Sequence, residues 1–305
     1  MAVAATRGRR FTLRATPRVP RSSELARHAV LLGFGFLIAF PFIWMLLTSF
    51  KPFEETLSSP PTVLPVHWRP ENYAEAWRAA DFPRFFMNSA LVSLTTVGGT
   101  LVTSVLAGYA FARLRFAGRD LLFLAFLGTM MIPQEVTLIP NFVLLSNLPC
   151  PIPVDTICNP KGAGWFDTFT AISVPWWVSV FSIFLLRQFF LGIPNELWEA
   201  SQIDGATHFR YLWQVVVPLS SPALLTVGLY AFVQSWKSFL WPLVMTSRPE
   251  VRPIQVGLST FALENGTYYH TLMAASAFTI APVIILFVLV QRHFLESIAR
   301  SGLKG

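Results

Sequence analysis

Two ionisable residues interrupt long apolar segments of this sequence, and they are the side chains best placed to do chemistry there. These residues are Glu135 and Lys237. A charged side chain near the middle of a membrane costs about 2.5–3.5 kcal/mol, so each should face a wet cavity or a partner. Counted from Leu121 and Pro222 at about 1.5 Å per residue, both lie roughly 21–22 Å along their helices. The alternative is that Lys237 snorkels to an interface at which Glu135 ends its helix.

No other arrangement of residues predicts catalysis. The sequence has no G-x-x-x-x-G-K-[ST] loop to cradle phosphates and no H-E-x-x-H zinc pair. The two glycines that follow Lys161, Gly162 and Gly164, are no nucleotide signal on their own. The five histidines are scattered: His28, His67, His208, His270 and His293. We therefore expect no enzyme activity, no metal site and no cofactor on this chain, so that any energised work draws its energy from a partner.

Both cysteines fall in one segment, LPCPIPVDTICNP, between two apolar runs. If this segment lies outside the cytoplasm, the oxidising surroundings would let Cys150 and Cys158 pair. Two unpaired thiols are the alternative. A disulfide would brace the loop and implies no chemistry.

The composition places the chain in a membrane. Of its 305 residues, 53% are hydrophobic and 13% are charged, against roughly 25% charged in soluble domains. About 20 apolar residues cross hydrocarbon as a helix. A basic segment 1–28 and a tail 293–305 flank a predicted membrane domain, 29–292. Within it, six segments predict an all-α polytopic membrane protein with six transmembrane helices: 29–50, 86–112, 121–142, 168–187, 220–246 and 268–291.

The distribution of Lys and Arg predicts that both termini lie in the cytoplasm. Basic residues are retained on the cytoplasmic side, and an even number of spans places the termini together. Seven arginines precede the first span, and three more lie at 113–120, between the second and third spans. The net charge of +7 is therefore explained by basic residues on the cytoplasmic side of the membrane. It does not indicate a nucleic-acid partner, since no recognition module accompanies the arginines.

Prolines and small residues predict where the helices are irregular or close-packed. Pro133 and Pro140 should bend or break the third span, which indicates a nearby cavity. The second span is rich in Ser, Thr, Gly and Ala, so we expect an interior helix that its neighbours approach closely. Between the first two spans, ENYAEAWRAADF could form a short helix at the membrane interface, anchored by Tyr73 and Trp77.

A short acidic helix is predicted between the fourth and fifth spans, in the stretch ELWEASQIDGAT. Pro194 suits its first turn, and Glu196 and Glu199 complement the helix dipole at that end. Asp204 and Gly205 favour a turn, so the helix should end near Gly205. A helix that lies on lipid headgroups normally presents Lys and Arg, whereas this one presents carboxylates. Docking onto a protein groove is therefore favoured over an interfacial helix.

The residues around this helix resemble a known family. The run LRQFFLGIPNELWEASQIDGATHFRYLWQVVVPLSSPAL is similar to the EAA loop of bacterial ABC-importer permease subunits, whose pattern is E-A-A-x-x-x-G followed by P-x-x-x-P. The matching residues are Glu199, Ala200, Ser201, Gly205, Pro218 and Pro222, with Ser201 in place of the second Ala. MIPQEVTLIP, SWKSFLWPL and the closing SGLKG resemble the carbohydrate branch, which includes the second maltose and glycerol 3-phosphate permease subunits. The resemblance extends over nearly the whole chain from about residue 29.

The resemblance implies a type I permease fold and a division of labour in the bacterial inner membrane. In such importers two homologous six-span permeases form the pore, a dimer of cytoplasmic ATPases uses ATP and Mg, and an extracytoplasmic solute-binding protein delivers the substrate. The coupling loop would be 191–218. It would dock on the ATPase through Glu196, Glu199, Ala200, Ser201, Asp204, Gly205 and Ala206. The tail from Ser301 to Gly305 would reach toward the ATPase dimer, with a disordered terminus as the alternative.

Within that family, Glu135 and Lys237 are candidates to line the outer half of a translocation pathway, where they could pair. Lys237 stands where the family often has Asn. Aromatic residues nearby could stack on a sugar ring or belong to packing and the aromatic belt: Tyr230, Trp236, Phe239 and Trp241. The predicted function is ATP-driven import of a sugar, oligosaccharide or glycerol-phosphate-like polyol. The alternative is an ion-gradient-driven secondary transporter, which would need a relay of carboxylates and would leave the acidic helix without a role.

Overall fold

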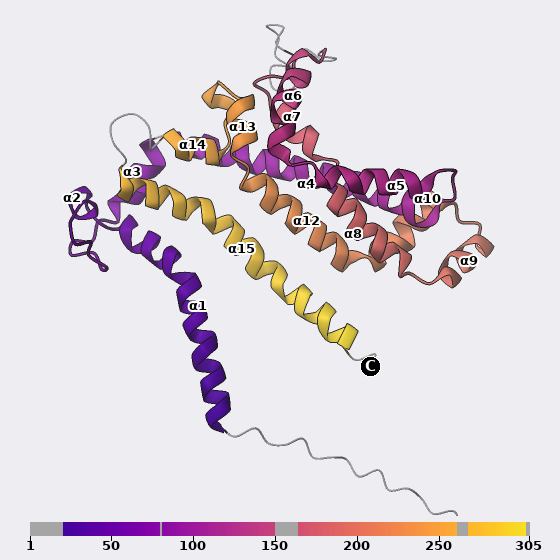
Figure 1. Ribbon diagram of the computed structural model, residues 1–305, viewed down its shortest axis with the longest axis horizontal. Helices are drawn as coiled ribbons and strands as arrows, with labels where there is room; N and C mark the ends of the chain where they lie inside the picture. Colours follow the sequence, from indigo (N-terminus) through magenta and orange to yellow (C-terminus); the bar gives the residue numbers. More distant parts are fainter. Residues whose placement is uncertain (1–20, 80, 150–163, 261–267, 303–305) are drawn as a thin grey trace, which may run out of the picture. The chain divides into compact units, whose positions relative to one another are not determined.

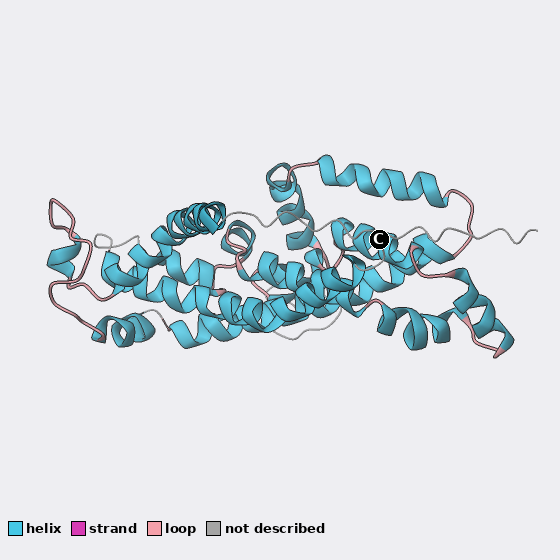
Figure 2. Cartoon of the chain, turned by 90° about the horizontal axis from the view of Figure 1, so that it is seen from below, coloured by secondary structure: helices cyan, strands magenta, loops and turns pink. Residues whose placement is uncertain are grey.

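The computed structural model describes residues 21–79, 81–149, 164–260 and 268–302, and all regular structure within these ranges is helical (Figure 1, Figure 2). The chain divides into two compact units, 1–45 and 46–305, which are described separately. Most of α1 (Arg21–Ser49) belongs to the first unit and contains Pro41. Along this helix the ring of Phe40 contacts the rings of Phe36 and Trp44, at centroid distances of 6.2 and 6.1 Å.

The helices long enough to cross a membrane agree with the predicted class. Four segments in the described ranges qualify, and two sharply bent pairs bring the number to six if each pair is one crossing. Three of the four are α1, α4 (Phe82–Arg113) and α15 (Tyr269–Gly302). The fourth, Phe169–Leu191, comprises three helical pieces: α7 (Phe169–Ser173), the 3-10 turn η2 (Val174–Trp176) and α8 (Val180–Leu191).

The third predicted span is broken at Pro133. Helix α5 (Arg119–Gly128) and the 3-10 turn η1 (Thr129–Met131) are followed by α6 (Gln134–Asn147) after a bend of 102°. Ile132 is extended because a proline disfavours helical backbone in the residue before it. Pro140, by contrast, lies inside α6 without ending it. Of the two prolines expected to disturb this span, one breaks it and the other is accommodated.

The fifth predicted span also differs from a single helix. Helical structure begins earlier, in α10 (His208–Tyr211), the π-helical turn η3 (Leu212–Val216) and α11 (Val217–Leu219). It then turns by 82° into α12 (Ser221–Trp236). The bend lies at Ser220, between Pro218 and Pro222, neither of which can donate a backbone hydrogen bond. Helix α12 ends at Trp236, and α13 (Leu240–Met245) follows a short break.

The remaining helices are short. They are α2 (Phe53–Thr56), α3 (Glu71–Ala79), α9 (Asn195–Ile203), the 3-10 turn η4 (Pro249–Val251) and α14 (Ile254–Thr260). Helix α3 is the short helix expected between the first two spans. Its Tyr73 and Trp77 rings contact the ring of Phe278 on α15, at centroid distances of 5.4 and 5.1 Å. The two aromatic residues predicted to be interfacial anchors thus join α3 to α15.

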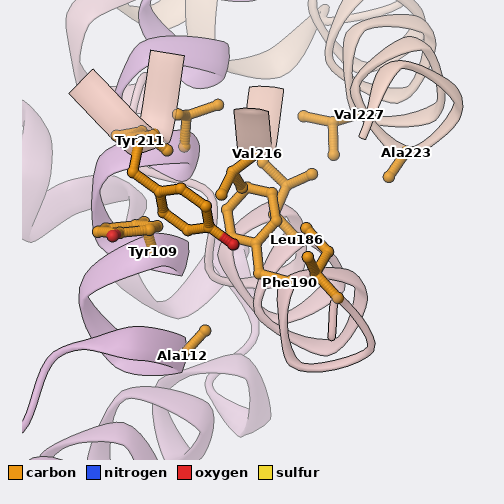
Figure 3. Close-up of a cluster of buried hydrophobic side chains, with 11 residues drawn as sticks. Tyr109, Ala112, Leu186, Phe190, Tyr211, Val216, Ala223 and Val227 are labelled. Carbon is orange, nitrogen blue, oxygen red and sulfur yellow. The ribbon is translucent and has the colours of Figure 1, made fainter. Parts of the chain in front are cut away.

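Helix α4 is the central helix of the second unit and packs against α8 and α12 (Figure 1). Its small residues permit this: a Cβ added to Gly99 would lie 2.2 Å from Trp177 Cγ, and one on Gly108 would lie 3.2 Å from Leu186 Cβ. Figure 3 shows a cluster of buried hydrophobic side chains at these interfaces. The buried side chains there are Tyr109, Ala112, Leu186, Phe190, Tyr211, Val216, Ala223 and Val227. The interior position expected for the second span is confirmed.

Two adjacent glycines of α4 test whether close approach matters. We expect Gly99→Ala to destabilise the chain by about 1–3 kcal/mol, because the added methyl group would overlap the Trp177 ring. Gly98→Ala is the matched control, since a Cβ there has no neighbour within 4 Å and alanine favours a helix. The midpoint of thermal unfolding in detergent, followed by tryptophan fluorescence, measures the difference. Equal midpoints for the two variants would contradict the expectation.

Candidate functional site

A cavity of about 530 Å³ opens among α4, α6, α8, α12 and the break that follows α12. Its walls carry many hydroxyl groups, three side-chain amides and several aromatic rings. Only two of its lining residues are charged, Glu135 and Lys237. Such walls offer hydrogen-bond donors and acceptors beside flat apolar faces, which suits a polar, uncharged or weakly charged solute.

Glu135 and Lys237 line the same cavity, and both stand at helix ends instead of within continuous spans. Glu135 lies in the first turn of α6, where a carboxylate complements the helix dipole. Lys237 is the C-cap of α12, and a cation is favourable at the C-terminal end of a helix. Its backbone N–H donates to Val233 O at 3.1 Å. Within the described part of the chain, no ion pair of 4 Å or less joins them. The structure brings the two residues together in one cavity without pairing them.

Three of the four aromatic candidates line the cavity. Tyr230 does so with its ring 4.7 Å from that of Phe181, and Phe239 and Trp241 join them. Trp236 lies elsewhere: it is 3% exposed, its Nε1 donates to Thr279 O on α15 at 2.8 Å, and it does not line the cavity. This tryptophan therefore fastens α12 to α15.

The polar wall that α4 contributes is not among the residues predicted to line a pathway. Ser89, Thr96 and Thr100 line the cavity from this helix, and Trp176 lines it from η2. The signal was available: hydroxyl residues recur at intervals of three or four along α4, which places them on one face. Their small size alone predicts close helix packing. Thr100 serves both purposes, because its Oγ1 also donates to Trp176 O at 3.1 Å.

The predicted acidic helix is present as α9, one residue later in its start than the sequence suggested. Pro194 is the N-cap, not the first helical residue, and Asp204 is the C-cap. Gly205 ends the helix with a φ of +74°, a backbone conformation that favours glycine. Most of the helix surface is exposed, including the acidic Glu196 and Glu199.

Helix α9 presents apolar side chains outward, and its aromatic residue Trp198 packs against the bundle. Leu197 is 40% exposed and Ile203 is 89% exposed. Trp198 is half-buried, and its ring stacks on the ring of His208 at 4.2 Å and contacts Tyr211 at 5.0 Å. The predicted coupling residues Ala200, Ser201 and Ala206 lie on or just after the same helix. Exposed leucine and isoleucine beside carboxylates form a mixed surface of the kind that docks onto a protein.

A buried carboxylate ties together two segments that adjoin α7 and α13, helices that each contribute residues to the cavity wall. Asp167, just before α7, has a side chain that is 4% exposed. It accepts hydrogen bonds from the backbone N–H groups of Ser247 and Arg248, at 2.9 and 3.0 Å, and from Arg248 Nε at 2.6 Å. Close by, Trp241 Nε1 on α13 donates to Ala171 O on α7 at 3.0 Å. We call these contacts the α7–α13 clamp.

Comparison with known proteins shows the family to which the chain belongs. Residues 99–300 match the family described as binding-protein-dependent transport system inner membrane component. The chain belongs to this family. The permease is 31% identical to the arabinooligosaccharides transport system permease protein AraQ of Halalkalibacterium halodurans, over 93% of this chain and 99% of that protein. It is 30% identical to the diacetylchitobiose uptake system permease protein NgcG of Streptomyces coelicolor, over 94% and 91% of the two chains.

Other similarities agree with the permease fold. The sn-glycerol-3-phosphate transport system permease protein UgpE of Yersinia pestis is 28% identical, over 92% of the permease and 98% of that protein. A crystal structure of a bacterial ABC transporter involved in the import of the acidic polysaccharide alginate contains a chain with a TM-score of 0.75 and 24% identity, over 92% of the permease and all of that chain. A bacterial alginate ABC transporter in complex with an alginate pentasaccharide-bound periplasmic protein gives a TM-score of 0.55 at 15% identity, over 90% and 93%.

Family membership makes this chain a multi-pass membrane permease subunit, and the relatives it resembles are permeases, not enzymes. In the ranges that the structure describes, no group of three or more His, Cys, Asp or Glu residues could hold a metal ion. Cys150 and Cys158 lie outside the described residues, so their pairing stays a prediction. An ion-gradient-driven transporter, the alternative, is not favoured by this membership.

The α7–α13 clamp predicts how stability of the permease depends on pH. Burial alone would raise the pKa of the Asp167 carboxyl, but the Arg248 and Ser247 backbone N–H groups and the Arg248 guanidinium outweigh it and lower this pKa. The carboxyl therefore stabilises the fold fully above its unfolded-state pKa of about 3.9, and this contribution is lost as pH falls through the lower folded-state pKa.

We expect Asp167→Asn to lower the free energy of unfolding at neutral pH by about 1.5–3 kcal/mol, since it weakens charge-assisted hydrogen bonds. The deficit relative to the unsubstituted chain should stay constant down to about pH 5 and shrink below about pH 4. Thermal unfolding midpoints measured across this range test it. Asp81→Asn is the matched control: Asp81 and Asp167 both have a positive φ, but the ion pair of Asp81 with Arg84 is half-exposed and contributes little. A deficit that does not change with pH would refute the assignment.

Proposed function

We propose that this permease subunit imports a carbohydrate or a related polyol. The observation that carries the substrate class is the lining of the cavity. Hydroxyl and amide side chains can exchange hydrogen bonds with sugar hydroxyls, and the rings of Tyr230, Trp176 and Trp241 offer apolar faces to a sugar ring. The names of three relatives point the same way, since they specify arabino-oligosaccharides, diacetylchitobiose and sn-glycerol 3-phosphate.

The energy for import comes, in this proposal, from an ATPase dimer that binds ATP and Mg on the cytoplasmic side. Helix α9 is the docking element: Glu196, Glu199, Ala200, Ser201, Asp204, Gly205 and Ala206 form or follow its surface. The exposed apolar residues Leu197 and Ile203 support a protein partner over a lipid surface, because they sit among carboxylates that an anionic leaflet would repel. No nucleotide-binding role falls to this chain.

The rest of the assembly follows from the same proposal. A second, homologous permease subunit completes the pore within the bacterial inner membrane, and an extracytoplasmic binding protein delivers the solute to the cavity. One structural relative is described in complex with a sugar-bound periplasmic protein, which supports such a partner. Both termini and α9 then lie in the cytoplasm, with the α7–α13 clamp and the cavity toward the outer face.

The ATPase partnership is tested by purifying the tagged chain in mild detergent. We expect a second permease and an ATPase to co-purify, and ATP to drive uptake into proteoliposomes supplied with binding protein. The solutes to offer are arabinotriose, diacetylchitobiose and glycerol 3-phosphate. Uptake of these solutes driven by a sodium or proton gradient without ATP would contradict the proposal.

Glu199→Ala on α9 should reduce ATP-driven uptake at least about tenfold, equivalent to about 1.4 kcal/mol of coupling, with less ATPase recovered in the purified complex. Glu71→Ala removes an exposed carboxylate from α3, outside the proposed docking surface, and should leave both measurements unchanged. Equal loss in the two variants would show that the effect is not specific to α9.

Lys237→Met and Glu135→Gln test the pathway residues. Each substitution removes a charge from the cavity wall while keeping a side chain of similar size, so we expect slower uptake with the complex still assembled. Arg84→Met removes a cation from outside the cavity and serves as the control. The uptake rate at saturating binding protein is the measurement. Unchanged uptake in both Lys237→Met and Glu135→Gln would remove these residues from the pathway.

A further inference from the structure

The last residue of α4, Arg113, holds three acceptors, which lie on α8, on α9 and in the connection between them. Its Nη1 donates to Asn195 Oδ1, on the first residue of α9, at 2.5 Å. Its Nη2 donates to Phe190 O at 2.7 Å and also to Ile193 O. A guanidinium presents its N–H groups in a rigid fork, so one side chain can bind several acceptors in a fixed geometry.

The acceptors lie where helix α8 ends and helix α9 begins. Phe190 O is among the last four carbonyls of α8, and it also accepts from the Ile193 backbone N–H at 3.3 Å. Ile193 O stands in the connection between α8 and α9. Arg113 therefore fixes the end of α8 and the start of α9 to the end of α4. The arginine also places a positive charge at the negative ends of the α4 and α8 dipoles.

A second contact joins α4 to the middle of α9. Tyr109 lies one turn before Arg113, and its hydroxyl is hydrogen-bonded to His208 Nδ1 at 2.9 Å. The His208 ring in turn stacks on Trp198 of α9 at 4.2 Å, with an angle of 13° between the planes. Helix α9 is thus held to α4 directly at its start and through His208 at its centre.

Helix α4 carries this attachment to the cavity without a break. Thr100, Thr96 and Ser89 line the cavity and lie roughly 20, 26 and 36 Å along the helix from Arg113, at about 1.5 Å per residue. Helix α8 also runs unbroken from Val180 and Phe181 at the cavity to Leu191, and Arg113 holds its end at Phe190 O. The two other helices that wall the cavity follow sharp bends, of 102° before α6 and 82° before α12. A continuous helix transmits an axial or tilting displacement with less loss than a bent one.

We propose that Arg113 is a positioning residue that joins α9 to α4, so that a displacement of α9 reaches the cavity wall along α4. The inference rests on the proposed docking of an ATPase to α9. It adds the path inside this chain: α9 to Arg113, then along α4 to Thr100 and Thr96. Asn195 contributes one of the three contacts, and Tyr109 supports them through His208 and Trp198.

The test reads the cavity wall directly and needs no substrate. In the co-purified complex, with Cys150→Ser and Cys158→Ser to remove both native thiols, Thr96→Cys places a reporter on α4. Its rate of modification by a small methanethiosulfonate reagent is measured without nucleotide and after trapping the ATPase with ATP and vanadate. Trapped nucleotide is measured in the same samples. With Arg113 present, we expect trapping to change the modification rate at least about fivefold.

Arg113→Gln should reduce this change to less than about twofold while the amount of trapped nucleotide stays the same, which a loss of folding or assembly would not do. Asn195→Ala removes one acceptor and should give an intermediate change. Arg115→Gln is the matched control, because Arg115 is an exposed arginine two residues further on that lines no part of the cavity. If the Arg113→Gln variant does not assemble with the ATPase, the change in modification rate in the Asn195→Ala variant tests the role of Arg113.

The outcomes distinguish a failure of this inference from a failure of the proposed function. A complex that traps no nucleotide with Arg113 intact would refute the ATPase partnership and, with it, the inference. Trapping without any change at Thr96→Cys would refute the path along α4 alone. A full change in an assembled Arg113→Gln complex, or in Asn195→Ala when Arg113→Gln does not assemble, would refute the role of Arg113 while leaving the importer proposal intact.

Discussion

Close approach of neighbouring backbones to α4 is the constraint on which the rest of this bundle depends. Lipid tails are as apolar as the helices, so apolar surface alone does not drive helices together, and short contacts must. Gly99 lets the Trp177 ring lie against the α4 backbone, and Gly108 does the same for α8. At that distance the hydroxyls of Thr100 and Thr103 reach the carbonyls of Trp176 and Trp177, at 3.1 and 2.5 Å. The break between η2 and α8 is tolerated inside the protein because α4 supplies these donors.

The breaks in the helices in turn create the polar cavity. Each interruption exposes backbone groups and ends a helix where a charged side chain is favourable, which is where Glu135 and Lys237 stand. In the bent arrangement both charged residues line one cavity, whose wall also carries hydroxyl groups. The irregular backbone and the polar lining are therefore two aspects of one arrangement.

Much of this could be predicted from the sequence, and the failures have physical reasons. Long uncharged runs and the Pro-Asn-Glu start and Asp-Gly end of α9 are local signals, so the class of membrane protein and the presence of the acidic helix could be predicted from them. Whether a proline breaks a helix does not depend on the local sequence alone. Pro133 ends a helix whereas Pro140 lies within one, because the surrounding packing decides whether a proline is accommodated. The burial of Trp236 against α15 and the partners of Arg113 are contacts between distant segments, which spacing along the chain does not encode.

The α7–α13 clamp has a consequence for how such a cavity can open. Asp167 and Arg248 lock the chain before α7 to the chain after α13, and Trp241 adds a second fastening to Ala171 a short distance away. Two fastenings between the same pair of segments suppress both sliding and hinging between them. These contacts make α7 and α13 one rigid edge of the cavity, so a solute would have to enter beside this edge and not between the two helices.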